Sequence, residues 1–114
     1  MEDCIFCKII NKEIPAAIVY EDERLLVFKD INPQAPVHLL LVPKKHIATL
    51  FDAGSEDEVT LGAIQLVAAK VARDQGLYER GFRLVLNCQE PSGQLVFHVH
   101  YHLLAGRAFG WPPG

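Results

Sequence analysis

The chain has 114 residues, of which 50% are hydrophobic and 22% are charged, and its formal net charge is -3. This length and composition predict one packed domain over residues 1–114, and they exclude a disordered chain or two independent cores. The acidic balance argues against a nucleic-acid partner, and no apolar run approaches the ~20 residues that a membrane span requires.

Helix and strand patterns follow one another along the chain, separated by charged turns and prolines. Helices are expected over 4–12, 46–51 and 55–76, and strands over 17–21, 25–30, 37–42, 82–87 and 95–105. Runs of strands with few helices, without strict alternation, predict an α+β fold. We therefore expect a sheet of about five antiparallel strands, one short N-terminal helix and one long helix.

The long helix has recognisable start and stop signals. Ser55 and Glu58 have the spacing of a capping box, in which each side chain bonds the other residue's backbone N–H. Apolar residues then recur at helical spacing, and Gly76 is a typical stop. The pattern predicts a helix that begins at Ser55.

The three cysteines, Cys4, Cys7 and Cys88, form an odd set. Together with a start that lacks the basic and apolar segments of a secretory signal, this argues against a disulfide framework and predicts a cytoplasmic protein. Cys4 and Cys7 form a C-x-x-C pair, which can be a metal half-site or a redox pair. Because only three residues precede it, we favour the metal interpretation.

Three histidines, His98, His100 and His102, alternate along the last predicted strand. Period-two spacing places the imidazoles on one face, about 7 Å apart for neighbours. Burying them is costly unless each ring finds a partner. Two chemical interpretations compete with a chance arrangement: a metal site, and nucleophilic catalysis in which one imidazole attacks and its neighbours handle charge and protons.

The motifs of the whole chain resemble the histidine-triad (HIT) family, and within it the Hint branch in a variant with a C-x-x-C zinc site. Residues 93–107 (GQLVFHVHYHLLAGR) carry the signature H-φ-H-φ-H-φ-φ, in which φ is apolar. Matching segments occur in the same order at 8–15, 30–36, 42–47 and 111–114. The resemblance extends from about residue 4 to residue 114 and implies a HIT-like fold paired as a homodimer.

The resemblance implies a purine nucleoside phosphoramidase, which cleaves the P–N bond of a nucleoside 5′-phosphoramidate. His100 would attack phosphorus and form a nucleotidyl-histidine intermediate that water hydrolyses. His102 would stabilise charge on a phosphate oxygen, and His98 would orient its neighbours. Neutral imidazole, with a pKa of ~6.5, is a nucleophile at cell pH. We expect a backbone carbonyl to hold the second ring nitrogen of His100.

The resemblance also implies a pocket for an AMP-like purine nucleotide. Asp30 corresponds to the acid that binds ribose, since a carboxylate can accept from two adjacent hydroxyls. His38 is expected to face this pocket, although it could also be a metal ligand. The other nucleotide-binding candidates are the apolar walls Ile5, Phe6, Ile9, Phe28 and Ile31, the amide Asn87, the phosphate-facing Gly93 and Leu95, and the tail residue Trp111.

Zinc is the cofactor that the resemblance suggests, and the chemistry does not require it. The four ligands would be Cys4, Cys7, His46 and His98, a complete set for a closed tetrahedral site. A zinc-bound His98 would be rigid and would brace the chain segment that carries His100. The alternative is a pair of reduced thiols with His46 at the surface.

One residue departs from the family pattern. Leu95 stands where the family usually has serine or threonine, so a hydroxyl donor is missing, and Ser92 could replace it. A donor aimed at developing charge can contribute ~3 kcal/mol to the transition state. This keeps open a dinucleoside polyphosphate hydrolase or nucleotidyl transferase, a nucleotide-binding regulator with weak turnover, and a zinc hydrolase that uses all three histidines on one metal.

Overall fold

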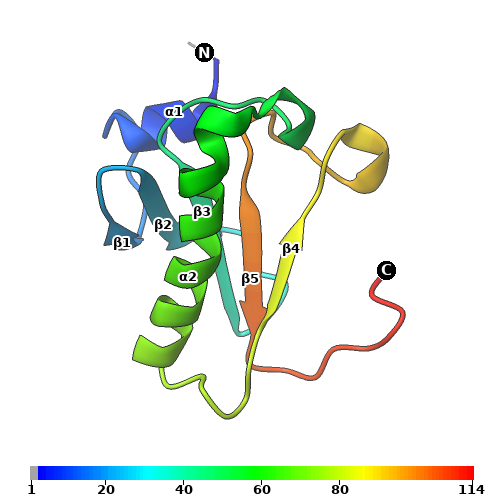
Figure 1. Ribbon diagram of the computed structural model, residues 1–114. Helices are drawn as coiled ribbons and strands as arrows, with labels where there is room; N and C mark the ends of the chain where they lie inside the picture. Colours follow the sequence, from blue (N-terminus) through cyan, green and yellow to red (C-terminus); the bar gives the residue numbers. More distant parts are fainter. Residues whose placement is uncertain (1–2) are drawn as a thin grey trace.

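The computed structural model describes residues 3–114, so the first two residues of the predicted domain lie outside the described range (Figure 1). A five-stranded sheet, antiparallel throughout, has the order β1–β2–β3–β5–β4. The elements are α1 (Ile5–Ile10), β1 (Ile18–Glu21), β2 (Leu25–Lys29), β3 (Val37–Pro43), α2 (Glu58–Asp74), β4 (Arg83–Leu86) and β5 (Tyr101–Ala105), with 3₁₀ turns at Leu50–Asp52, Ser55–Asp57 and Glu90–Ser92. The predicted α+β class and sheet are confirmed.

The central strands β2 and β3 are apolar throughout because both faces of the sheet are covered. Alternate residues such as Leu25 and Leu41 join a core with α2, on the face that Figure 1 shows toward the viewer. The residues between them, such as Phe28 and Leu40, join a second core with α1. Leu40 pairs with His102 on β5, so His102 lies on the α1 face.

The last strand is shorter than predicted. It begins at Tyr101, whereas the pattern predicted a strand from residue 95. Pairing with β3 ends at Leu41 opposite Tyr101, and two residues further β3 reaches Pro43, which has no N–H to donate. The Pro43 carbonyl is bonded instead by the His98 ring, 2.8 Å away. His98 and His100 therefore lie in an irregular segment that leads into the strand.

Two predicted helix boundaries are wrong. The long helix begins at Glu58, because the Asp57 carboxylate accepts from the Gly54 N–H (2.9 Å) and pairs with Lys45 (2.8 Å), and Ser55 belongs to a 3₁₀ turn. The segment 46–51 is not a helix, since the Ile47 carbonyl accepts from Val99 N–H at 2.7 Å. Within residues 3–114, neither α1 nor α2 is both long and apolar enough to cross a bilayer.

Candidate active site and metal centre

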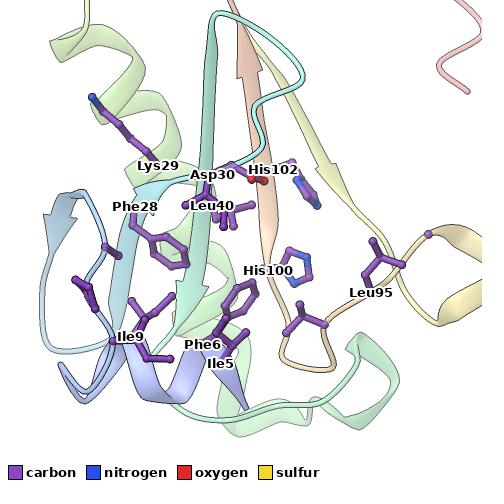
Figure 2. A pocket seen from close by; sticks show the side chains of 16 residues that line it. Ile5, Phe6, Ile9, Phe28, Lys29, Asp30, Leu40, Leu95, His100 and His102 are labelled. Atoms are coloured by element: carbon purple, nitrogen blue, oxygen red, sulfur yellow. The ribbon is translucent and has the colours of Figure 1, made fainter. Parts of the chain in front are cut away.

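A cavity of about 290 Å³ opens on the α1 face of the sheet (Figure 2). Side chains of α1, the end of β2 and the segment before β5 line it. Figure 2 shows the His100 ring between the apolar side chains of α1 and an end formed by Asp30 and His102. The lining residues are Ile5, Phe6, Ile9, Ile14, Pro15, Ala16, Phe28, Lys29, Asp30, Ile31, Leu40, Gly93, Leu95, Val96, His100 and His102.

Phe6 joins the apolar half of this cavity to the histidines. Its ring packs edge-on against Phe28, with centroids 5.6 Å apart, and against His100, with centroids 5.0 Å apart. It also contacts the His98 ring at 5.9 Å. Such edge-to-face pairs fix ring orientation as well as burying area. The helix α1 therefore positions both the apolar wall and the His100 ring.

His100 has a defined proton arrangement. Its Nδ1 lies 2.8 Å from the His98 carbonyl oxygen, which can only accept, so Nδ1 carries the proton. In the neutral ring, Nε2 then carries the lone pair. Burial lowers the pKa of His100, against the opposing effects of the His98 carbonyl and Asp30. The expected backbone carbonyl partner is therefore present, and His100 lines the cavity as a neutral imidazole.

A second group of side chains stands behind His102. His38 Nε2 lies 2.9 Å from His102 Nδ1 and 3.4 Å from an Asp30 carboxylate oxygen. The backbone N–H of Gln34 donates to His38 Nδ1 at 3.0 Å. Burial holds the pKa of His102 at about 4, with contributions from His100 and His38, and burial also lowers the pKa of His38. Both rings are neutral at pH 7.

The second cluster of ligand-type side chains is Cys4, Cys7, His46 and His98, and these four are positioned to hold a metal ion. Nδ1 of His98 lies 3.4 Å from the Cys4 sulfur and 3.6 Å from the Cys7 sulfur. Nδ1 of His46 lies 3.4 Å from the Cys7 sulfur and 3.2 Å from Nδ1 of His98. The set combines the first turn of the chain, the end of β3 and the segment before β5.

These distances fit a tetrahedral ion. Zinc with Zn–S of about 2.3 Å and Zn–N of about 2.0 Å separates sulfur from nitrogen by about 3.5 Å and two nitrogens by about 3.3 Å. The His98 Nε2 donates to the Pro43 carbonyl at 2.8 Å, which leaves the Nδ1 lone pair facing the sulfurs. Burial raises the pKa of Cys7 to about 11, so a cation is needed to hold that sulfur as thiolate.

The three triad histidines do not share one face of a strand, contrary to the sequence prediction. His98 is fully buried and turns toward the cysteines, whereas His100 and His102 face the cavity with ring centroids 5.0 Å apart. The metal-ligand groups found among residues 3–114 never combine all three histidines. The interpretation as a zinc hydrolase with three histidines on one metal is therefore wrong.

Most of the predicted pocket residues lie together, but three do not line the cavity. Ile5, Phe6, Ile9, Phe28, Asp30, Ile31, Gly93 and Leu95 all line it, with Ile31 98% exposed and Leu95 86% exposed. His38 lies behind His102, and the Asn87 side chain lies beside Gly93. Trp111 is in the exposed tail.

Sequence reasoning missed several lining residues. Leu40 could have been found from strand pairing, because it lies directly opposite His102. Lys29 and the segment 14–16 come together only through the path of the chain between α1 and β1, for which the sequence carries no separate signal. Val96 lies in the irregular segment that was predicted to be strand.

The fold and the triad define a class of nucleotide-binding hydrolase domains, and the comparisons agree. The family model described as "Scavenger mRNA decapping enzyme C-term binding" matches residues 3–109. An HIT-like protein of Synechocystis is 58% identical over 99% of this chain and 98% of its own length. The chain belongs to the histidine-triad family.

Two further relatives carry functional names. The purine nucleoside phosphoramidase of Escherichia coli K12 is 48% identical, over 96% of this chain and 92% of its own. A crystal structure of a HIT family hydrolase from Legionella pneumophila Philadelphia 1 has a TM-score of 0.95 and 53% identity, covering 98% of this chain and 100% of that one. The fold, including the irregular triad segment, is therefore shared with solved relatives.

Proposed function

We propose that the protein hydrolyses the P–N bond of purine nucleoside 5′-phosphoramidates through a nucleotidyl-His100 intermediate. The observation that carries this proposal is the 2.8 Å contact between His100 Nδ1 and the His98 carbonyl, which leaves the Nε2 lone pair free in a ring that lines the cavity. The 48% identity to a purine nucleoside phosphoramidase supports the choice of bond. The covalent step divides one difficult displacement into two easier ones.

The reaction balances with water as the only co-reactant. His100 Nε2 attacks phosphorus, the P–N bond breaks, and the amine leaves with one added proton. The phosphorylated ring keeps its Nδ1 proton on the His98 carbonyl. Water then attacks the same phosphorus, the bond to Nε2 breaks, and the two products are a nucleoside 5′-monophosphate and the free amine.

The cavity offers a matching place for each part of a nucleotide. The apolar walls Phe6, Ile9 and Phe28 suit a purine base, and Ile5 and Ile31 extend them at the rim. Asp30 is the proposed ribose acceptor. At the phosphate end we propose donors from His102 and from the backbone N–H groups of Gly93 and Leu95, where the φ of 111° at Gly93 favours glycine. His38 and Asn87 act from behind, through His102 and Gly93.

The metal that we propose for the second cluster is zinc in a structural role. Cys4, Cys7, His46 and His98 would hold it, and four protein ligands close the tetrahedron. A closed site leaves no position for substrate, so bound zinc would contribute stability and no chemistry. His98, the shared residue, would also hold the carbonyl that orients His100.

We also propose a cytoplasmic homodimer. Among the described strands β4 pairs only with β5, so its other edge is open for a second copy. Val59 and Leu66 on α2 are 63% and 74% exposed, and burial against a partner would remove this apolar surface from water. Trp111, 83% exposed, would reach toward the partner's site. The free cysteines suit a reducing compartment.

One observation favours a second candidate, a nucleotide-binding regulator with weak turnover. Leu95 lines the cavity without the hydroxyl expected there, and the Ser92 hydroxyl is engaged with the carbonyls of Cys88 and Gln89 at 2.8 and 2.9 Å. Ser92 is thus committed elsewhere, so it does not replace the missing donor. A dinucleoside polyphosphate hydrolase or nucleotidyl transferase would use the same nucleophile and has no separate support in the cavity.

The test compares an adenosine 5′-phosphoramidate with a dinucleoside polyphosphate at matched concentrations, using wild type, His100→Ala and the control Cys88→Ser. We expect the wild type and Cys88→Ser to prefer the phosphoramidate. His100→Ala should lose cleavage by about 10⁴-fold or more while binding AMP nearly normally. A preference for the polyphosphate would reassign the substrate, whereas AMP binding without cleavage by wild type would favour the regulator. Cleavage that survives in His100→Ala would remove His100 from its role.

A further inference from the structure

Three groups behind the cavity form a hydrogen-bonded row. The Gln34 N–H lies 3.0 Å from His38 Nδ1, and His38 Nε2 lies 2.9 Å from His102 Nδ1. The row ends at the His102 ring, which lines the cavity. Among residues 3–114, no hydrogen-bond partner occupies Nε2 of His102, on the opposite edge of that ring.

The protons in this row can be assigned from one end. A backbone N–H can only donate, so His38 Nδ1 accepts and the neutral His38 ring carries its proton on Nε2. That N–H donates to His102 Nδ1, and the neutral His102 ring must then carry its proton on Nε2. Asp30 agrees with this assignment, because its carboxylate oxygen, 3.4 Å from His38 Nε2, also requires a proton there.

From this row we propose that His38 is a positioning residue, which fixes His102 as the tautomer with Nε2–H facing the phosphate. The role rests on the proposed function and differs from direct contact with the nucleotide. His100 and His102 then present opposite properties at neighbouring positions: a lone pair for attack on phosphorus and an N–H donor for the charge that develops on a phosphate oxygen. Donors set in place before the reaction contribute most to such stabilisation.

The amide that starts the row is held on both sides. The Gln34 carbonyl accepts from the Arg107 side chain at 3.1 Å, which ties the loop to the segment after β5. At Gly106, where φ is 92°, a Cβ atom would approach Pro36 to 2.8 Å, so this residue allows the two segments to pack closely. The donor to His38 is therefore part of a braced loop.

A metal site competes for the same atoms, because Asp30, His38 and His102 offer one carboxylate and two imidazoles within ligand distance. A metal on His38 Nε2 would require the ring proton to move to Nδ1. It would then point at the Gln34 N–H, which also carries a proton. The backbone therefore favours the hydrogen-bonded row over a metal.

The direct test is nuclear magnetic resonance of the full-length, zinc-loaded protein labelled with [¹⁵N]histidine. We expect His38 and His102 to be protonated at Nε2 only, with a nitrogen–nitrogen coupling across the hydrogen bond from His38 Nε2 to His102 Nδ1. A His38 ring protonated at Nδ1 would overturn the proposal. So would resonances of the two rings that shift when one further equivalent of Zn²⁺ or Mn²⁺ is added.

Kinetics on the phosphoramidate supply the functional arm. His38→Leu should lower kcat by about 10- to 100-fold with little change in KM, as for other residues that orient a working imidazole. His38→Gln, whose amide N–H reaches the same position, should recover most of the loss. The control Val37→Ala, also on β3, should lower stability without lowering kcat. Equal kcat in His38→Leu and wild type would overturn the role. A wild type inactive on phosphoramidate contradicts only the proposed function, and the coupling measurement still decides the row.

Discussion

Two histidine clusters lie on the same side of the sheet, and their atoms are similarly close. In the cysteine cluster, the two Nδ1 atoms of His46 and His98 approach to 3.2 Å. In the cavity cluster, His38 Nε2 and His102 Nδ1 approach to 2.9 Å. The difference lies in the outer partner of each ring. The Pro43 carbonyl takes the proton of His98 outward, whereas the Gln34 N–H forces the proton of His38 inward.

This difference shows how a single backbone group decides what a histidine cluster can do. A carbonyl on the outer nitrogen leaves lone pairs facing one another, which favours a cation between them. A backbone N–H on the outer nitrogen places a proton between the rings, which favours a hydrogen bond. His100 follows the first rule with the His98 carbonyl and gains a free lone pair toward the cavity.

The largest expected effect breaks the cysteine cluster. Cys4→Ser combined with Cys7→Ser removes two of the four ligands, so the folded protein loses zinc. With free zinc at 1,000 times its dissociation constant, the lost binding lowers the free energy of unfolding by about 4 kcal/mol. That corresponds to a fall in Tm of roughly 15 °C, measured by differential scanning calorimetry.

Cys88→Ser is the matched control for this variant, because Cys88 lies outside the cluster, and it should keep wild-type Tm. Elemental analysis should find one zinc per wild-type chain and none in the double variant. Asp30→Asn should still bind one zinc, since the cavity cluster is not a metal site. Two zinc ions per wild-type chain, with one lost in Asp30→Asn, would erase the distinction between the clusters.

The next largest effect concerns pH and the neutral His102. Its native pKa of about 4 lies below the ~6.5 of an unfolded histidine, so the unfolded chain binds a proton first as the pH falls. This contribution to stability is fully present above pH 6.5 and is lost progressively toward pH 4. The loss is at most about 3 kcal/mol for this group.

Urea unfolding at pH 7 and pH 4.5, at equal zinc concentration, measures this effect. His102→Gln should lose less stability than wild type between the two pH values, because the burial of one titrating ring is gone. His38, His100 and Asp30 face this position and remain in both proteins, so their contributions largely cancel. Equal losses in the two proteins would mean that His102 is not held neutral.

The smallest effect concerns the donors at the phosphate end. Leu95→Ser restores a hydroxyl at a position that is 86% exposed, so the change should cost little stability. A new donor near the phosphate should raise kcat on the phosphoramidate about tenfold, or 1.4 kcal/mol in the barrier. Leu95→Ala separates donation from space: an equal gain in that variant would mean that bulk, and not the missing hydroxyl, limits the rate.

The sequence predicted the sheet and the helices well where local patterns decide structure. The apolar runs 25–30 and 37–42 became β2 and β3, and strand spacing correctly paired the end of the chain with the centre of the sheet. It failed where side chains replace ladder bonds. The His98 ring takes the Pro43 carbonyl and the Asp57 carboxylate takes the Gly54 N–H, and both contacts join residues whose approach no local pattern specifies.

The candidate site divides in the same way. Residue types and spacing indicated His100, Asp30 and the cysteine pair, because chemistry restricts which side chains can act there. The role of His38 depends on a backbone N–H four residues earlier, and the loop that carries it is braced by Arg107, far along the chain. Such outer partners are visible only in three dimensions.

The central claim is that His100 Nε2 attacks phosphorus, and the stereochemistry of the reaction tests it most directly. The substrate is an adenosine 5′-phosphoramidothioate of one configuration at phosphorus, hydrolysed in ¹⁸O-labelled water. Two successive in-line displacements, first by His100 and then by water, predict net retention of configuration in the product. Net inversion would mean a single attack by water, and would contradict the covalent intermediate.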